Sequence, residues 1–124
     1  MRGSPSVGID LIEIERVAAA LARHGQRFAE RCFTPAERAY CEARPNPAQH
    51  YAGRFAAKEA VGKALGIGVH FTWREIEIAG PGKPRVVLSG ASARRALALD
   101  AAEIELSITH SRGLAAAVAA LGRR

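Results

Sequence analysis

Two acidic side chains are the groups in this sequence best suited to chemistry. Asp10 stands inside the apolar run Val7–Ile12, and Glu59 stands inside the segment Phe55–Gly66. A carboxylate among apolar residues is costly to bury unless it is paired or holds a metal. Two carboxylates match the way in which proteins usually hold Mg²⁺, with waters and substrate phosphates completing the octahedron. Asp10 and Glu59 are therefore a candidate magnesium site for a substrate that carries phosphate.

Basic residues beside Glu59 suit such a substrate. Phe55, Glu59 and Lys63 are spaced four apart, so they share one face of a helix. Lys58 and Lys63 would contact phosphate oxygens, and Lys63 would stabilise charge on a leaving group. A Glu followed four residues later by a Lys is also the commonest solvated pair on helices, and it contributes only a few tenths of a kcal/mol. A plain surface pair therefore remains the alternative.

Two glycines near Glu59 also suggest a ligand. Gly62 and Gly66 leave the flank of this helix free of bulk, although a glycine within a helix costs about 1 kcal/mol relative to alanine. That cost is easier to understand if a ligand must approach the backbone closely. The sequence has neither a Walker loop nor a Gly-x-Gly-x-x-Gly fingerprint, so the patterns disfavour NTP hydrolysis and dinucleotide redox chemistry.

The elements that position these residues are predicted from periodicity and turn signals. Val7–Ile12 is typical of a strand with Asp10 near its end, and a helical pattern follows from Ile14 until Gly25 stops it. Residues 26–32 continue helically beyond a kink. The longest helix is predicted from the turn Pro45–Pro47 to Leu65, and Gly66 and Gly68 stop it. The remaining patterns predict a helix that starts at the capping signal Thr34–Glu37 and ends before Pro45, a hairpin of residues 72–79 and 85–88, a helix over 92–99 and a half-buried strand over 103–109.

The segment Leu114–Leu121 is ambiguous. Its alanines favour a helix, whereas the tight turn Ser111–Gly113 after a strand favours a returning antiparallel strand. We find no repeat and no low-complexity linker, so residues 1–124 are expected to form a single domain of helices and short strands.

Composition narrows the class of protein. No apolar run approaches the roughly 20 residues of a membrane-spanning helix, and the opening Met1–Ser6 lacks the apolar core of a secretion signal. We therefore expect a cytoplasmic protein. Cys32 and Cys41 lack the spacing of a zinc site, and a cytoplasmic pair is usually reduced. The net charge of +6, with arginine supplying 15 of the 18 basic residues, indicates an anionic partner: a nucleic acid, a nucleotide, an acidic protein or anionic lipid.

Three short motifs follow one another in a fixed order. They are Gly8-Ile9-Asp10 before the first helix, Arg54–Gly66, and Ser107–Ser111 near the end. Gly82-Lys83-Pro84 falls in the predicted hairpin, and Phe33–Glu37 precedes the second helix. From Val7 to Ala120 this ordered set resembles the holo-acyl-carrier-protein synthases, the small stand-alone branch of the 4′-phosphopantetheinyl transferases. The opening Met1–Ser6 matches nothing in that family and is expected to be disordered or an expression remnant.

The resemblance implies a fold and a reaction. The fold is α+β, with a long helix packed on a small antiparallel sheet, and residues 114–121 are then a strand. The reaction is transfer of the 4′-phosphopantetheine group of coenzyme A to a serine of apo acyl carrier protein, with release of adenosine 3′,5′-bisphosphate, in fatty-acid synthesis. The expected partners are coenzyme A and the carrier, with neither nucleic acid nor membrane, in a homotrimer with active sites at subunit interfaces.

The resemblance also implies roles for particular residues. Asp10 and Glu59 would ligate Mg²⁺, and Lys63 would lie beside the pyrophosphate as a clamp or proton donor. The resemblance leaves open whether a metal-bound water or a nearby carboxylate accepts the serine proton. The residues expected to bind coenzyme A are Arg54, Phe55, Lys58, Gly62, Lys63, Gly66 and His110. His110 would reach the nucleotide from a neighbouring subunit, although by itself it suits a strand-end residue bonded to backbone groups. No role is assigned to His24, His50 or His70.

A row of arginines is a candidate docking surface. Arg16, Arg23 and Arg27 are spaced seven and four apart, so one continuous helix would place them in a stripe. In the family that this chain resembles, the basic first helix docks the acidic helix of the carrier, although such a stripe is also compatible with a solvated face. Glu15 precedes Arg16 where family members can carry a cation, which would weaken or retune docking.

Two other functions compete with this hypothesis. A small basic nucleic-acid-binding module would explain the charge, and steep salt-dependent binding to generic RNA or DNA would favour it. It leaves Asp10 and Glu59 unexplained, and aromatic residues are only 6% of the chain, too few for a stacking platform. The second rival is a family member that binds carrier or coenzyme A without catalysis. The presence of Asp10, Glu59 and Lys63 argues against it.

Overall fold

The computed structural model describes residues 6–67 and 71–123. The elements are β1 (Ser6–Glu13), α1 (Ile14–His24), α2 (Gln26–Cys32), α3 (Pro35–Glu42), α4 (Pro47–Ala64), a 3₁₀ turn (Trp73–Glu75), β2 (Ile76–Ala79), β3 (Arg85–Leu88), α5 (Gly90–Ala98), β4 (Ala101–Ser111) and β5 (Leu114–Arg123). Met1–Pro5 and His70 lie outside the described residues. Ser6, which was grouped with the unmatched opening, instead begins β1 and pairs with Leu121.

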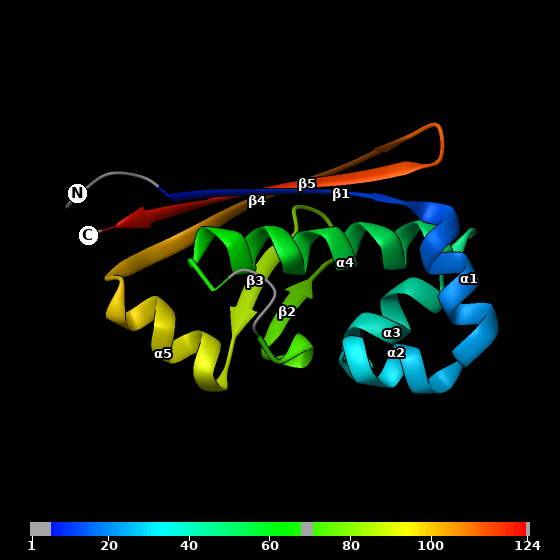
Figure 1. The fold of residues 1–124 in the computed structure, drawn as a ribbon, viewed down its shortest axis with the longest axis horizontal. Coiled ribbons are helices and arrows are strands. Elements are labelled where there is room, and N and C mark those ends of the chain that lie inside the picture. The colour runs from blue at the N-terminus through cyan, green and yellow to red at the C-terminus, as the bar shows by residue number, and fades with distance from the viewer. Residues whose placement is uncertain (1–5, 68–70, 124) are drawn as a thin grey trace.

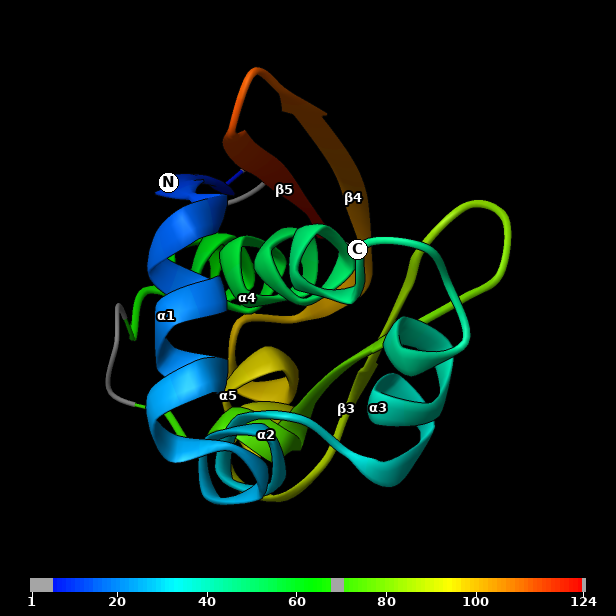
Figure 2. The ribbon, with the colours of Figure 1, turned by 90° about the vertical axis from the view of Figure 1, so that its right-hand side faces the viewer.

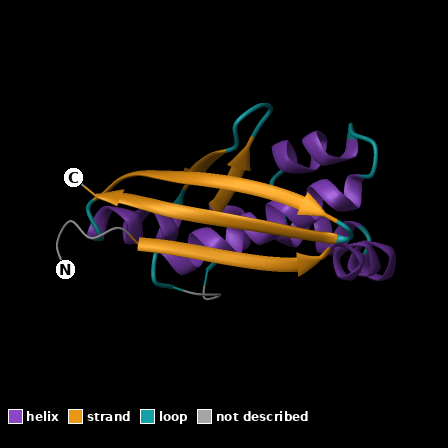
Figure 3. Cartoon of the chain, turned by 90° about the horizontal axis from the view of Figure 1, so that it is seen from above, coloured by secondary structure: helices purple, strands orange, loops and turns teal. Residues whose placement is uncertain are grey.

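The strands form two antiparallel sheets. β1, β5 and β4 make a three-stranded sheet in that order, and β2 pairs with β3. Helix α4 lies along one face of the larger sheet (Figure 1). Seen from above, the three strands lie nearest the viewer, and none of the described helices covers their outer face (Figure 3). The predicted α+β fold, a long helix on a small antiparallel sheet, is confirmed.

β5 resolves the ambiguous alanine-rich segment in favour of a strand. Its inward positions Ala115, Ala117 and Ala119 are 0%, 1% and 0% exposed, and more exposed residues alternate with them. Pairing with β1 on one side and β4 on the other satisfies the backbone groups of β5. These long-range pairings outweigh the local preference of alanine for a helix.

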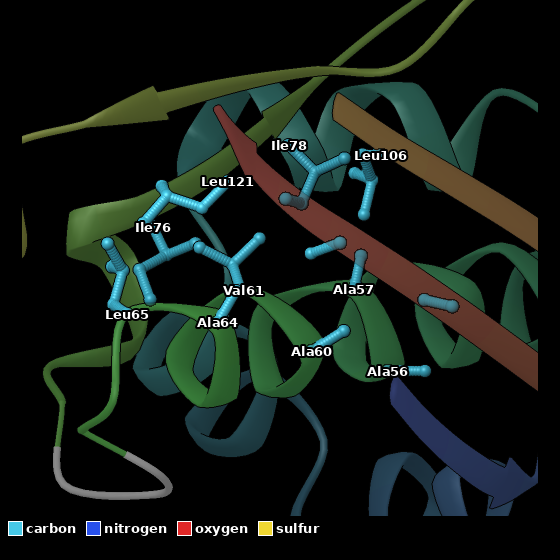
Figure 4. Close-up of a cluster of buried hydrophobic side chains, with 12 residues drawn as sticks. Ala56, Ala57, Ala60, Val61, Ala64, Leu65, Ile76, Ile78, Leu106 and Leu121 are labelled. Carbon is cyan, nitrogen blue, oxygen red and sulfur yellow. The ribbon is translucent and has the colours of Figure 1, made fainter. Parts of the chain in front are cut away.

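Small side chains bring α4 close to the sheet. Ala56, Ala57, Ala60 and Ala64 of α4 are at most 2% exposed and belong to the main core cluster (Figure 4). On β1, a Cβ atom added at Gly8 would lie only 1.9 Å from the carbonyl oxygen of Ala60. The backbones of β1 and α4 therefore touch at Gly8, and this contact brings the strand that carries Asp10 against the helix that carries Glu59.

We expect Gly8→Ala to lower the free energy of unfolding by about 3 kcal/mol, because the new methyl group would force β1 away from the α4 backbone. Urea denaturation followed by circular dichroism measures this loss. Gly122→Ala in β5 is the matched control, since its added Cβ meets nothing closer than 3.8 Å, and it should change stability by less than about 0.5 kcal/mol. A Gly8→Ala protein as stable as the wild type would contradict the close contact.

Two local predictions need correction. The predicted strand 72–79 is a strand only from Ile76, because Trp73–Glu75 forms a 3₁₀ turn. The second is the single arginine stripe: the predicted stop of the first helix at Gly25 is confirmed, and the φ of 54° at this residue interrupts the chain before α2 begins. Arg27 therefore does not continue a single stripe with Arg16 and Arg23. The Thr34 capping box that starts α3 is confirmed, with reciprocal hydrogen bonds between Thr34 and Glu37.

Both cysteines, Cys32 and Cys41, are free thiols in the core. Burial raises the pKa of each thiol, that of Cys41 to about 12. Among the residues described, no helix combines the length and the hydropathy needed to span a membrane.

Candidate functional site

Asp10 and Lys63 meet where β1 lies against α4. Lys63 Nζ donates hydrogen bonds to the carbonyl oxygen of Ile9 (2.8 Å) and to Asp10 Oδ1 (3.3 Å). The Asp10 side chain is largely buried, at 13% exposed, whereas that of Lys63 is half-exposed. Asp10 was predicted near the end of its strand but lies within it, because β1 continues to Glu13, which pairs with Leu114. Asp10 of β1 and Lys63 of α4 are therefore in contact.

Glu59 lines the same cavity as Asp10 and Arg16. Burial raises the pKa of Glu59, and the negative charge of Asp10 raises it further, against the lowering effect of Lys63 and Arg16. A divalent cation bound by both carboxylates would relieve this repulsion. Within residues 6–67 and 71–123, no cluster of three or more metal-ligating side chains occurs. Asp10 and Glu59 are two carboxylates at one cavity that would be available to a divalent cation.

The lining of this cavity is partly charged and partly apolar. Its volume is about 410 Å³, with Asp10, Glu59 and Arg16 as its charged part and Phe28 and Phe55 among its apolar lining. The Phe55 ring is held in place by stacking on Trp73, at 4.5 Å between centroids. The cavity therefore combines charged side chains with an apolar wall.

Lys58 points away from this cavity, so the predicted contact between Lys58 and phosphate is wrong. The Nζ atom is fully buried and donates hydrogen bonds to Glu37 Oε1 (2.8 Å), Trp73 O (3.0 Å) and Ile76 O (2.7 Å). These partners use all three ammonium protons. Helix α4 is buried on most sides, so the side chain of Lys58, the neighbour of Glu59 in the sequence, points into the core.

Arg54 and His110 line a second cavity of about 190 Å³, which shares no lining residue with the first. Arg54 precedes Glu59 by five residues, so the two side chains leave α4 about 140° apart. Viewed along α4, helix α1 lies on one side and α3 with the β2–β3 hairpin lies on the other (Figure 2). Within one subunit, the residues expected to bind coenzyme A therefore fall into two separate groups.

The two glycines have structural explanations. Gly66 follows the end of α4 with a φ of 76°, a left-handed conformation that glycine adopts without strain. Gly62 is buried in the structure, so it does not present the open flank that the sequence suggested. Contacts of Gly62 and Gly66 with coenzyme A stay predictions.

Exposed arginines cover α1 and α2. Arg16, Arg23 and Arg27 are all exposed, and so is Arg31, which the sequence reasoning passed over although it follows Arg27 by four residues. Among the described residues none of the four arginines has a carboxylate within 4.0 Å. The break at Gly25 spreads them over two helices, so they form a broad basic surface beside the first cavity instead of a stripe.

The chain is similar in sequence and in fold to known proteins. Residues 6–119 match the family model of the 4′-phosphopantetheinyl transferase superfamily. The holo-[acyl-carrier-protein] synthase of Moorella thermoacetica is 50% identical over 115 residues, which span 90% of this chain and 89% of that protein. The crystal structure of holo-[acyl-carrier-protein] synthase from Neisseria meningitidis superposes with a TM-score of 0.87 at 28% identity, covering 95% of this chain and 98% of the other. The Helicobacter pylori enzyme in complex with coenzyme A gives a TM-score of 0.81 at 30% identity, covering 94% and 99%.

Proposed function

The chain belongs to the 4′-phosphopantetheinyl transferase superfamily, and we propose that it transfers the 4′-phosphopantetheine group of coenzyme A to a serine of an apo acyl carrier protein. The observation that carries this proposal is the convergence of Asp10 from β1 and Glu59 from α4 at one cavity, with Lys63 of α4 bonded to Asp10. The relative from Helicobacter pylori, whose structure contains coenzyme A, supports the choice of co-substrate. We place the reaction in fatty-acid synthesis in the cytoplasm.

The residues at the first cavity have different roles in the proposed reaction. Asp10 and Glu59 would hold Mg²⁺, which supplies polarisation of the β-phosphorus and neutralisation of the leaving bisphosphate. The serine oxygen of the carrier forms a bond to the β-phosphorus as its proton passes to a water or to a nearby carboxylate, and the bond from that phosphorus to the bridging oxygen breaks. Lys63 would stabilise the charge on the released adenosine 3′,5′-bisphosphate. Its hydrogen bonds to Asp10 and to the backbone of β1 hold its ammonium group beside the carboxylates.

We propose that the chain forms a homotrimer. In it, the second cavity of one subunit completes the active site at the first cavity of its neighbour. Arg54 and His110 cannot reach the Asp10 cavity of their own chain, because they lie across α4 from it. The outer face of the larger sheet supports an interface between copies. Val7, Ile9 and Leu11 of β1 are 60%, 61% and 62% exposed, and Val118 of β5 is 40% exposed. Such a contiguous apolar surface is typical of protein interfaces.

Mixed trimers test this shared site. Glu59→Gln and His110→Ala should each reduce transfer when expressed alone and assayed below saturating coenzyme A. Co-expression with two different tags, followed by tandem purification of the mixed trimers, should restore about a third of the sites of the wild-type trimer, because one interface in each mixed trimer combines an intact Glu59 with an intact His110. Failure of every mixture to exceed its parents, although sedimentation shows mixed trimers, would place both residues in one subunit's site.

The basic surface of α1 and α2 suits an acidic carrier protein. We expect Arg16→Ala to weaken carrier binding about fivefold at 50 mM salt and by less at 500 mM, since Debye screening shortens the reach of the charge. Surface plasmon resonance with immobilised apo carrier at the two salt concentrations measures this difference. Arg94→Ala is the control, because Arg94 is exposed on α5, away from α1. Equal losses for the two variants would refute a docking role for Arg16.

The reaction itself is tested by intact-protein mass spectrometry of an apo acyl carrier protein incubated with this protein, Mg²⁺ and coenzyme A. The expected result is a gain of one phosphopantetheine on the carrier, which a chelator prevents. Absence of any gain with several apo carriers, while the protein is folded and binds coenzyme A, would favour the binding-only rival. A gain that survives the chelator would overturn the role assigned to Asp10 and Glu59.

A further inference from the structure

The second cavity contains a histidine to which neither the sequence motifs nor the proposed mechanism gives a role. His50, from the first turn of α4, lines the cavity together with Arg54 and His110. Its ring contacts that of Tyr40 at 6.0 Å and that of His110 at 6.4 Å between centroids. Gln49 Nε2 lies 3.1 Å from His110 Nε2 and holds that ring at the cavity wall. His50 thus stands beside two residues expected to bind coenzyme A.

The charges around this cavity are all positive. The Tyr40 ring has the guanidinium carbon of Arg44 at 3.4 Å and that of Arg54 at 3.7 Å from its centroid. Both contacts are short enough to place the ring between the two guanidinium groups. Within the described part of the chain, the cavity lining contains no carboxylate. Cations gathered without a counter-charge repel one another, and an anion would relieve that repulsion.

Arg54 is the residue of this cavity whose donors best suit a phosphate. The residue is only 6% exposed, yet its Nε atom is buried without a hydrogen-bond partner among the described residues. A buried donor of this kind costs free energy unless a partner arrives. The guanidinium group offers the planar, paired donors that match a phosphate. The cavity therefore offers cations and planar donors that suit a phosphate-sized anion.

Coenzyme A carries two kinds of phosphate, and the proposed function accounts for one of them. The pyrophosphate is assigned to the cavity of Asp10, Glu59 and Lys63. The remaining anionic group is the terminal 3′-phosphomonoester. Resting on that proposed function, we propose that His50 binds this phosphomonoester together with Arg54 and His110, and that His50 takes up a proton when coenzyme A binds.

The direction of the pH effect follows from the surroundings of His50. Burial, then the charges of Arg44, Arg54 and His110, lower the pKa of His50 in the free protein, which favours its neutral ring. The groups that face it are Tyr40 from α3, Arg44 after α3, Arg54 from α4 and His110 from β4, whereas the hairpin contributes only Gly82 and Pro84. A dianion in the cavity raises the pKa of His50. Affinity for coenzyme A therefore rises as the pH falls from 8.0 to 6.5, with proton uptake.

The test is calorimetric titration of the protein with coenzyme A and with dephospho-coenzyme A, in Mg²⁺, at pH 6.5 and 8.0, in buffers of different ionisation enthalpy. His50→Phe keeps the ring against Tyr40 but removes the charge. We expect it to weaken coenzyme A binding about fivefold at pH 6.5 and to reduce proton uptake, while dephospho-coenzyme A binds as before. The phosphate group's own titration is common to both proteins and cancels in the comparison.

Controls separate this proposal from the function on which it rests. His24→Phe, the same change at an exposed histidine of α1, should bind both ligands like the wild type. His50→Gln repeats the measurement if the phenylalanine variant does not fold. Equal affinity and equal proton uptake in wild type and His50 variants would overturn the role of His50 alone. If the wild type binds neither ligand, the proposed function fails instead.

Discussion

Glu59→Gln is expected to reduce the rate of phosphopantetheine transfer at least about a thousandfold, because the substitution removes one of the two carboxylates available to hold Mg²⁺. Asp10→Asn should have a comparable effect. Intact-protein mass spectrometry of the carrier at fixed times gives the rate, and calorimetric titration with Mg²⁺ and coenzyme A shows the accompanying loss of binding. Retention of more than about a tenth of the rate would contradict the metal assignment.

The stability of the Glu59→Gln variant distinguishes a functional role from a structural one. Burial and the charge of Asp10 raise the pKa of Glu59 in the folded, metal-free protein. The folded state therefore holds the proton more readily than the unfolded state, so this carboxyl group stabilises the fold at low pH and loses that contribution as the pH rises through its folded pKa. At pH 8 the amide should leave the metal-free protein at least as stable as the wild type.

A matched control for Glu59→Gln is Glu103→Gln, the same change at an exposed position of β4. It should alter neither the transfer rate nor the melting temperature beyond about 1 °C. If Glu59→Gln melts well below the wild type in the absence of metal, its loss of activity would be a folding defect. Glu59 would then be a structural residue.

Lys58→Met is expected to lower the free energy of unfolding by about 3–5 kcal/mol, the usual cost of removing one partner from a buried ion pair. Lys58 and Glu37 are both fully buried at 2.8 Å, so the substitution leaves the Glu37 carboxylate without its counter-charge. Glu37 also accepts a hydrogen bond from the backbone N–H of Ile78 (2.7 Å), which ties α3 to β2. Urea denaturation at pH 7 measures the loss.

Lys63→Met provides the contrast, since it is the same substitution on the same helix at a half-exposed position. We expect it to change stability by less than about 1 kcal/mol and to lower the transfer rate instead. The double variant Glu37→Gln/Lys58→Met should recover part of the stability, because no isolated charge remains in the core. A Lys58→Met protein within about 1 kcal/mol of the wild type would contradict the ion pair.

Local patterns in the sequence were sufficient for the elements that carry the site. The helix spacing of Phe55, Glu59 and Lys63 and the apolar run around Asp10 predicted α4 and β1, and both are observed. The Thr34 capping box predicted the start of α3. These features depend on hydrogen bonds and side-chain spacings within a few residues, so they can be derived without knowledge of the rest of the chain.

The direction of each α4 side chain was decided by the tertiary structure. Periodicity predicts relative angles around a helix, but α4 is buried on most sides, so no polar face shows which angle points to solvent. Lys58 consequently bonds Glu37 in the core, and Arg54 leaves the helix opposite to Glu59, toward His50 and His110. Glu37 and His50 acquire their partners only when α3, β4 and the hairpin pack around α4.

The conformation of the alanine-rich segment near the C-terminus was also decided by the tertiary structure. By itself the segment Leu114–Leu121 suits either a helix or a strand, and only pairing with β1 and β4 makes it β5. The sequence alone therefore determined which residue types are available for chemistry and the local elements that carry them. The tertiary structure decided which of them meet, because burial and long-range strand pairing depend on segments far apart in the chain and outweigh local propensity.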